Sequence, residues 1–217
     1  MNRKVVVIIA GLLFLGALAA LWQELKPPVA NFNRAPITGA GQVLVDEIAR
    51  TLHDHGRIVV VVPAVPGINP PVMPPNGLWD GFQDELKKHS GISVAATEFV
   101  PCDRDGMPGI ASKAFREVWE HHRKADAIVC FGGLPLWNEG RDLAGPGANP
   151  KLIVIDIDTP PKKRRYQDYF SSGMLQLLVG FRTNFSETTP SAPTTPREWF
   201  QSRYQVYTVE NYESLPD

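Results

Sequence analysis

The strongest constraint on the fold is an alternation of short apolar runs with amphipathic segments across residues 38–183. The run RIVVVV at 57–62 is almost wholly β-branched, which is typical of a strand buried on both faces of a parallel sheet. Similar runs at 92–100, 126–133 and 151–158 predict three more strands. Because helical patterns separate these runs, we expect right-handed crossovers and a doubly wound, flavodoxin-like α/β sheet of about four or five strands.

Apolar residues at helical spacing recur between the predicted strands. The first such segment, 38–56, predicts a helix with Thr38 as its cap. Two more helices are expected at 77–91 and 111–125, and a last one within YQDYFSSGMLQLLVGF at 166–181. These elements define one α/β domain over residues 38–183.

Residues 5–22 form an uncharged apolar run of eighteen residues. As a helix this run would be about 27 Å long, close to the roughly 30 Å of a bilayer's hydrocarbon core. The basic Arg3 and Lys4 precede it, which favours a cytoplasmic N-terminus, a single inner-membrane pass and an extracytoplasmic, periplasmic domain. The predicted anchor spans residues 1–25, before a proline-rich stalk at 26–37. The predicted membrane-anchor residues are Val5, Ile9, Leu13, Leu18 and Trp22.

A cleaved signal peptide is the main alternative for this run. Ala17-Leu18-Ala19 fits the A-x-A cleavage pattern, with residues 5–16 as the apolar segment. The apolar run continues past that point through Leu21 and Trp22, which favours an uncleaved anchor. The sequence leaves cleavage open.

Charge and cysteine usage exclude some classes of function. The 22 basic and 23 acidic residues nearly balance, so no nucleic-acid partner is expected. Cys102 and Cys130 permit a disulfide in an oxidising compartment, but Cys130 falls in a predicted buried strand, so their pairing stays open. We find no catalytic signature and no metal-ligand spacing. We therefore expect a protein that is not an enzyme and needs no cofactor or metal.

Three short motifs carry a family resemblance: WDGF at 79–82, ADAIV at 125–129 and IVID at 153–156. With their order along residues 57–158, they resemble the first lobe of type 1 periplasmic binding proteins, the sugar-binding relatives of the LacI repressor family. The resemblance implies an α/β lobe that contacts a sugar-like solute. Those proteins clamp the solute between two lobes, and the roughly 60 residues after residue 158 are too few for a second α/β lobe.

Four long loops follow the predicted strands and bring polar and aromatic residues to one edge of the sheet. A tryptophan there can stack on the apolar face of a sugar while amides and charged groups bind its hydroxyls. The loop ending in KKRR, at 162–165, is either a solvated helix start or a contact for acidic lipid headgroups. The predicted ligand-binding residues are Asn69, Asp103, Arg104, Trp137, Asn138, Arg141, Asp156 and Asp158.

The C-terminal region 184–217 begins with a Pro/Thr-rich loop and ends in an aromatic tail. RYQVYTV at 203–209 predicts a short edge strand. The aromatic residues predict docking, either on the chain's own domain or on a partner. They are Trp199, Phe200, Tyr204, Tyr207 and Tyr212.

Together these features predict a non-enzymatic accessory subunit whose domain docks on a larger membrane complex. Its partners would be the lipid bilayer and other membrane-protein subunits. The alternative is a membrane-tethered module that binds a sugar-like solute. An enzyme is the third hypothesis and has the least support in the sequence.

Overall fold

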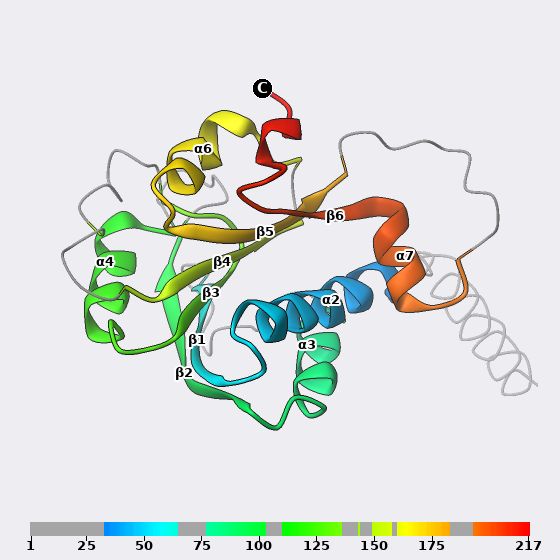
Figure 1. Ribbon diagram of the computed structural model, residues 1–217, viewed down its shortest axis with the longest axis horizontal. Coiled ribbons are helices and arrows are strands. Elements are labelled where there is room, and N and C mark those ends of the chain that lie inside the picture. Colours follow the sequence, from blue (N-terminus) through cyan, green and yellow to red (C-terminus); the bar gives the residue numbers. More distant parts are fainter. Residues whose placement is uncertain are drawn as a thin grey trace, which may run out of the picture. The chain divides into compact units, whose positions relative to one another are not determined.

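A computed structural model describes residues 33–64, 77–102, 110–135, 143, 149–157, 160–182 and 193–217. Residues Arg34–Asp217 form one compact unit with a single sheet and helices on both faces (Figure 1). In chain order the elements are α2 (Ala35–Thr51), β1 (Gly56–Ala64), α3 (Leu78–Leu86), β2 (Ile92–Pro101), α4 (Ser112–His121), β3 (Ala127–Phe131), β4 (Lys151–Asp156), α6 (Lys163–Ser171), β5 (Leu175–Phe181), α7 (Pro196–Arg203), β6 (Tyr204–Tyr207) and the 3₁₀ turn η2 (Tyr212–Ser214).

The sheet has six strands in the order β2-β1-β3-β4-β5-β6. The first five strands in this order run parallel, and β6 pairs antiparallel with β5. The predicted doubly wound α/β class is confirmed, and the predicted C-terminal edge strand is present as β6. The described sheet has one strand more than the upper expectation.

The two faces of the sheet bury separate apolar layers, as expected for strands covered on both sides. From β1, Ile58, Val60 and Val62 pack with α2, α3 and α7, whereas Val59 and Val61 pack with α4 and α6. Figure 1 shows these two groups of helices on opposite sides of the sheet. The near-continuous β-branched run of β1 is therefore explained by its central position.

The prediction of a helix within residues 166–181 is wrong for the second half of that segment. α6 ends at Ser171, Gly173 adopts a left-handed φ of +73°, and residues Leu175–Phe181 form the parallel strand β5. A short apolar run does not distinguish a buried helix from a strand buried on both faces, and here the sheet determines the outcome.

α2 packs against both α3 and α7, and two glycines of α2 determine how closely these helices approach it. α2 begins at Ala35, one turn before the predicted cap Thr38, because Pro36 is favourable in the first turn. A Cβ on Gly41 would lie 2.2 Å from the backbone oxygen of Leu78 at the start of α3. A Cβ on Gly39 would lie 1.8 Å from the backbone oxygen of Pro196 in α7. The glycines of the TGAGQ segment therefore serve helix packing.

The predicted anchor at 1–25 and most of the predicted stalk at 26–37 lie outside the described residues. The part that is described, from residue 33 onward, already enters α2. None of the helices within the described ranges has the length and apolar content needed to span a bilayer.

Candidate functional site

The carboxyl ends of the parallel strands meet at one edge of the sheet, where ligands bind in open α/β folds. The ends of β3 and β4 are joined there by a 2.7 Å hydrogen bond from the amide of Gly132 to the carbonyl of Ile155. This bond extends the pairing of β3 and β4 beyond the last residue of β3. The chain that leaves β3 therefore starts from a fixed position beside β4.

Two side chains of α6 hold the segment that follows β3. The guanidinium of Arg165 donates to the carbonyl of Leu134 at 3.2 Å, and the hydroxyl of Tyr169 donates to the carbonyl of Pro135 at 3.0 Å. Farther along, the indole N–H of the buried Trp119 on α4 donates to the carbonyl of Leu143 at 3.0 Å. Leu134, Pro135 and Leu143 are thus each held by a side chain from α4 or α6.

The last residue of β4, Asp156, is buried at this edge of the sheet, with 2% of its surface exposed. The hydroxyl of Tyr166 donates to its carboxylate, and the guanidinium of Arg165 lies 3.9 Å away. Burial, and then the nearby Asp156 charge, raises the pKa of Tyr166 well above its usual value. The pair therefore keeps a neutral phenol on a charged carboxylate beneath the edge.

This raised pKa predicts a loss of stability at alkaline pH. The contribution of Tyr166 is full below its unfolded pKa of about 10 and is lost as the pH rises toward the folded value, because the unfolded chain then binds fewer protons. We expect the free energy of unfolding to fall by up to about 1.4 kcal/mol per pH unit from this group. Urea titrations between pH 9 and about pH 11 measure the slope.

The matched variants are Tyr166→Phe and Tyr169→Phe, because both tyrosines are fully buried on α6. We expect Tyr166→Phe to remove this part of the slope and Tyr169→Phe to keep it. A slope in Tyr166→Phe equal to that of the wild-type protein would show that Tyr166 is not the responsible group.

Trp79 is an aromatic residue at this edge that is absent from the predicted ligand-binding set. It lies in the first turn of α3, half-buried, with its ring stacked on Phe82 at 5.3 Å and edge-on to Phe131 at 5.7 Å. Phe131 is the last residue of β3, so Trp79 lies at the carboxyl edge. The WDGF motif could have indicated Trp79, because the start of a helix that follows a parallel strand lies at the carboxyl edge of the sheet.

Of the eight predicted ligand-binding residues, Asp156 is the one within the described ranges. Its carboxylate already accepts a hydrogen bond from Tyr166 and is buried, so it supports the edge from below. The other seven lie outside the described residues: Asn69, Asp103, Arg104, Trp137, Asn138, Arg141 and Asp158.

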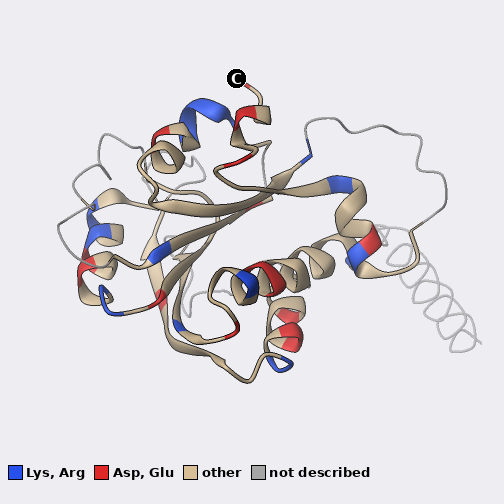
Figure 2. Cartoon of the chain, viewed as in Figure 1, with Lys and Arg blue, Asp and Glu red and all other residues tan. Residues whose placement is uncertain are grey.

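The KKRR cluster is the start of α6, as its solvated-helix interpretation predicts. Figure 2 shows these basic residues on the first turn of the helix. Lys163 is paired with Glu213 of η2, and Arg165 faces Asp156. Two of the four basic residues therefore stabilise the domain itself.

The aromatic tail packs on the chain's own domain. Phe200, Tyr204 and Tyr207 are buried in the two apolar layers, and the ring of Tyr212 stacks on Phe170 at 5.0 Å. Trp199, on α7, is half-buried. Most of the aromatic surface considered for partner docking is therefore covered within the domain.

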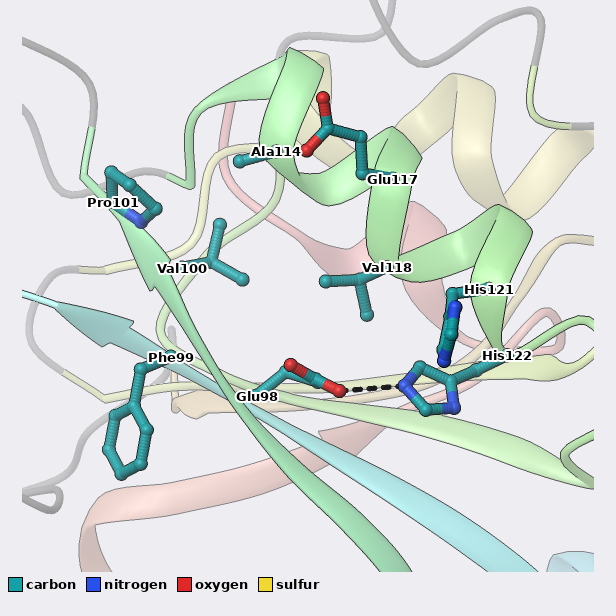
Figure 3. Close-up of a pocket in the computed structure, with 9 residues that line it drawn as sticks. All are labelled: Glu98, Phe99, Val100, Pro101, Ala114, Glu117, Val118, His121 and His122. Carbon is teal, nitrogen blue, oxygen red and sulfur yellow. Dashed lines mark hydrogen bonds and ion pairs between the residues drawn. The ribbon is translucent and has the colours of Figure 1, made fainter.

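A groove of about 540 Å³ follows the edge strand β2, between that strand and α4. Figure 3 shows Glu98 of β2 pointing toward His122, with which it forms an ion pair at 2.8 Å. The ring of His121 lies edge-on to that of His122, 4.7 Å away. None of the predicted ligand-binding residues lines this groove. Its lining residues are Glu98, Phe99, Val100, Pro101, Ala114, Glu117, Val118, His121 and His122.

Both cysteines are free thiols. Burial raises the pKa of Cys130, which lies within β3, and raises the pKa of Cys102 to a smaller extent. A protonated thiol is a poor nucleophile, so neither environment activates a cysteine for chemistry.

Comparison with solved structures gives matches among sugar-binding proteins, although no family model and no curated protein sequence matches the chain. A sugar-binding protein of a sugar ABC transporter from Bacillus halodurans has a TM-score of 0.52 and 15% identity, covering 82% of this chain and 63% of that one. A carbohydrate transporter solute-binding protein from Agrobacterium radiobacter, in complex with D-arabinose, has a TM-score of 0.53, 15% identity and coverages of 83% and 63%. A glucose-galactose binding protein from Geobacillus stearothermophilus has a TM-score of 0.51, 12% identity and coverages of 81% and 61%.

Because the sequence identities are only 12% to 15%, the similarity shows a shared fold and nothing more. This chain spans between 61% and 63% of the length of the three matched proteins. The resemblance that the sequence motifs carry is therefore confirmed at the level of fold: the domain shares the α/β fold of type 1 periplasmic sugar-binding proteins.

Proposed function

We propose that this chain is a membrane-tethered, extracytoplasmic module that binds a small sugar-like solute at the carboxyl edge of its sheet. The matched sugar-binding proteins support this function better than they support an accessory subunit. The burial of the aromatic tail within its own domain points the same way. The tether and the export are inferred from the apolar run at 5–22 and the basic residues before it.

The observation that carries the proposal is the set of contacts that hold Leu134, Pro135 and Leu143 at this edge. Three side chains from two helices make these contacts, namely Arg165, Tyr169 and Trp119. Backbone that is already held at a binding edge loses less conformational entropy when a ligand binds there. The sequence between Pro135 and Leu143 contains three of the predicted ligand-binding residues: Trp137, Asn138 and Arg141.

A sugar needs an aromatic face for its apolar side and hydrogen-bonding groups for its hydroxyls. Trp79 offers a ring at this edge whose orientation is set by Phe82 and Phe131. The predicted residues Trp137 and Asn138 offer a second ring and an amide. The described edge belongs to one α/β unit, and an open edge leaves more of a solute in water than a closed cleft, so we expect a dissociation constant of about 1 mM.

Thermal unfolding of the full-length protein in mild detergent tests the proposal with D-arabinose, D-glucose and D-galactose. At about 100 times the dissociation constant, a bound sugar stabilises the folded state by about 2.7 kcal/mol, or roughly 5–10 °C in Tm for a domain of this size. Trp79→Ala should abolish the rise in Tm. Trp199→Ala is the control, because Trp199 lies on α7, which leads into the edge strand β6, whereas Trp79 contacts the end of the interior strand β3; this variant should keep the rise.

If none of the three sugars raises the Tm of the wild-type protein, the solute-binding proposal fails for this class of ligand. If Trp79→Ala keeps the full rise, the ring at this edge is not part of the site.

A further inference from the structure

Three potential metal ligands gather at the opposite, amino edge of the sheet, near the starts of β1 and β2. They are Asp46 on α2, Glu85 on α3 and His89 in the turn after α3, and one ligand atom from each lies within 4.8 Å of the others. Their side chains are 25%, 9% and 22% exposed, in that order. The cluster is thus largely shielded from water but still reachable from it.

His89 is held between two carboxylates. Its Nδ1 lies 3.0 Å from a carboxylate oxygen of Asp54, and its Nε2 lies 3.4 Å from Oδ1 of Asp46. Each ring nitrogen of His89 therefore faces a carboxylate oxygen, so one carboxylate can orient the ring while the other shares an ion with it.

The 3.4 Å separation itself fits a shared ion. It is beyond the usual range for an N–H···O hydrogen bond. Two ligands bound to a tetrahedral zinc ion at about 2.0–2.1 Å lie about 3.4 Å apart. A carboxylate on the second nitrogen of the ring, as Asp54 is here, is the usual outer partner of a metal-bound histidine.

The backbone that carries these side chains is tightly constrained. Asp54 has a left-handed φ of +59°, and a Cβ on Gly91 would lie 1.9 Å from its carbonyl oxygen. The amide of Ile92 donates to the carbonyl of His89 at 3.0 Å. The close approach of α2 and α3 at Gly41 fixes Asp46 relative to Glu85. The cluster is therefore preorganised by three separate contacts.

Two basic side chains contact the outer carboxylate oxygens. Arg197 is paired with Oδ2 of Asp46, and Lys88 lies 2.9 Å from Oε2 of Glu85. These side chains are 52% and 63% exposed, so they can move aside at little cost. The ion pair with Arg197 uses Oδ2 of Asp46, whereas Oδ1 is the oxygen that faces His89. Figure 2 shows acidic and basic groups side by side where α2 and α3 end.

We propose that Asp46, Glu85 and His89 bind a divalent transition-metal ion of the zinc type, with Asp54 orienting His89. One imidazole with two carboxylates favours zinc-type ions, whereas an all-oxygen set would favour magnesium or calcium. Three protein ligands leave the fourth position to water. The site lies at the edge opposite the proposed solute site and does not depend on it.

Isothermal titration of the full-length protein, stripped with EDTA, with zinc chloride tests the proposal. We expect one site in the wild-type protein that binds zinc at least tenfold more tightly than magnesium or calcium. His89→Gln and Glu85→Gln should each weaken zinc binding by more than tenfold. Asp54→Asn should weaken it by about tenfold without removing the site, as outer partners of metal-bound histidines do.

The matched control is His122→Gln, which removes the histidine of the other carboxylate–histidine pair among the described residues, Glu98–His122. This variant should bind zinc as the wild-type protein does. Zinc should also raise the Tm of the wild-type and His122→Gln proteins and leave that of His89→Gln unchanged. Far-UV circular dichroism confirms that each variant is folded.

Three results would overturn the proposal. The first is wild-type binding no tighter than that of folded His89→Gln. The second is loss of binding in His122→Gln, which would place the ion in the groove beside β2. The third is equal affinity for zinc and calcium, which would exclude an imidazole ligand. Sugar binding would survive all three, since it depends on the other edge.

Discussion

Replacing Gly41 with alanine is expected to destabilise the protein by about 3 kcal/mol, although alanine is the better helix former. In the interior of a helix this change ordinarily gains about 1 kcal/mol. Here the new Cβ would lie 2.2 Å from the carbonyl oxygen of Leu78 and 2.7 Å from the amide nitrogen of Phe82. Both atoms belong to the backbone of α3, so relief requires α2 and α3 to move apart.

Gly173→Ala is the matched control for this variant. Gly173 has a φ of +73°, and a Cβ there would have no atom within 4 Å. Its substitution therefore costs only the left-handed backbone conformation, about 1 kcal/mol. Urea unfolding of both variants measures the difference. A Gly41→Ala protein as stable as Gly173→Ala would mean that α2 and α3 are not packed this closely.

Truncation of Trp119 to alanine should cost about 3–5 kcal/mol. The side chain is fully buried, its ring packs against Phe115 at 6.2 Å, and its N–H donates to the carbonyl of Leu143. The truncation leaves a large cavity beneath α4 and removes the hydrogen bond that holds Leu143. We therefore also expect a weaker response to sugar in this variant.

Trp199→Ala provides the comparison, since Trp199 is half-buried on α7. We expect it to cost about 1 kcal/mol. Trp119→Phe separates packing from hydrogen bonding: it keeps most of the ring and should lose about 1–2 kcal/mol for the missing N–H. If truncation of Trp119 costs no more than truncation of Trp199, the helix face around α4 is less tightly packed than the structure indicates.

The parallel sheet was predictable because its strands have a strong local signal. The run at 57–62 is almost wholly β-branched and so favours a strand covered on both faces, and the structure places it as β1 in the interior of the sheet. β5 was not predictable in the same way. Its sequence LQLLVGF has no period that separates a helix from a buried strand, and only its pairing with β4 and β6 decides the outcome.

The candidate solute site was predictable only in part. The rule that loops follow strand ends locates the edge and its polar residues. The supports of the edge come from residues distant in the sequence, such as Trp119 with Leu143 and Tyr169 with Pro135, so no local pattern indicates them. The proposed metal site was not predicted: a Glu and a His four positions apart do not indicate a metal site by themselves, and Asp46 joins Glu85 and His89 only through the contact of α2 with α3.

The contact between α7 and α2 makes the first helix of the domain depend on residues that the ribosome adds much later. α2 opens the domain, yet part of its apolar face is covered by Phe200 and by the backbone of Pro196, about 160 residues later. During synthesis this face stays uncovered until α7 has emerged from the ribosome. The nascent chain therefore has to be shielded from aggregation until then, and a product that terminates before α7 would expose an apolar helix face rather than form a shorter folded domain.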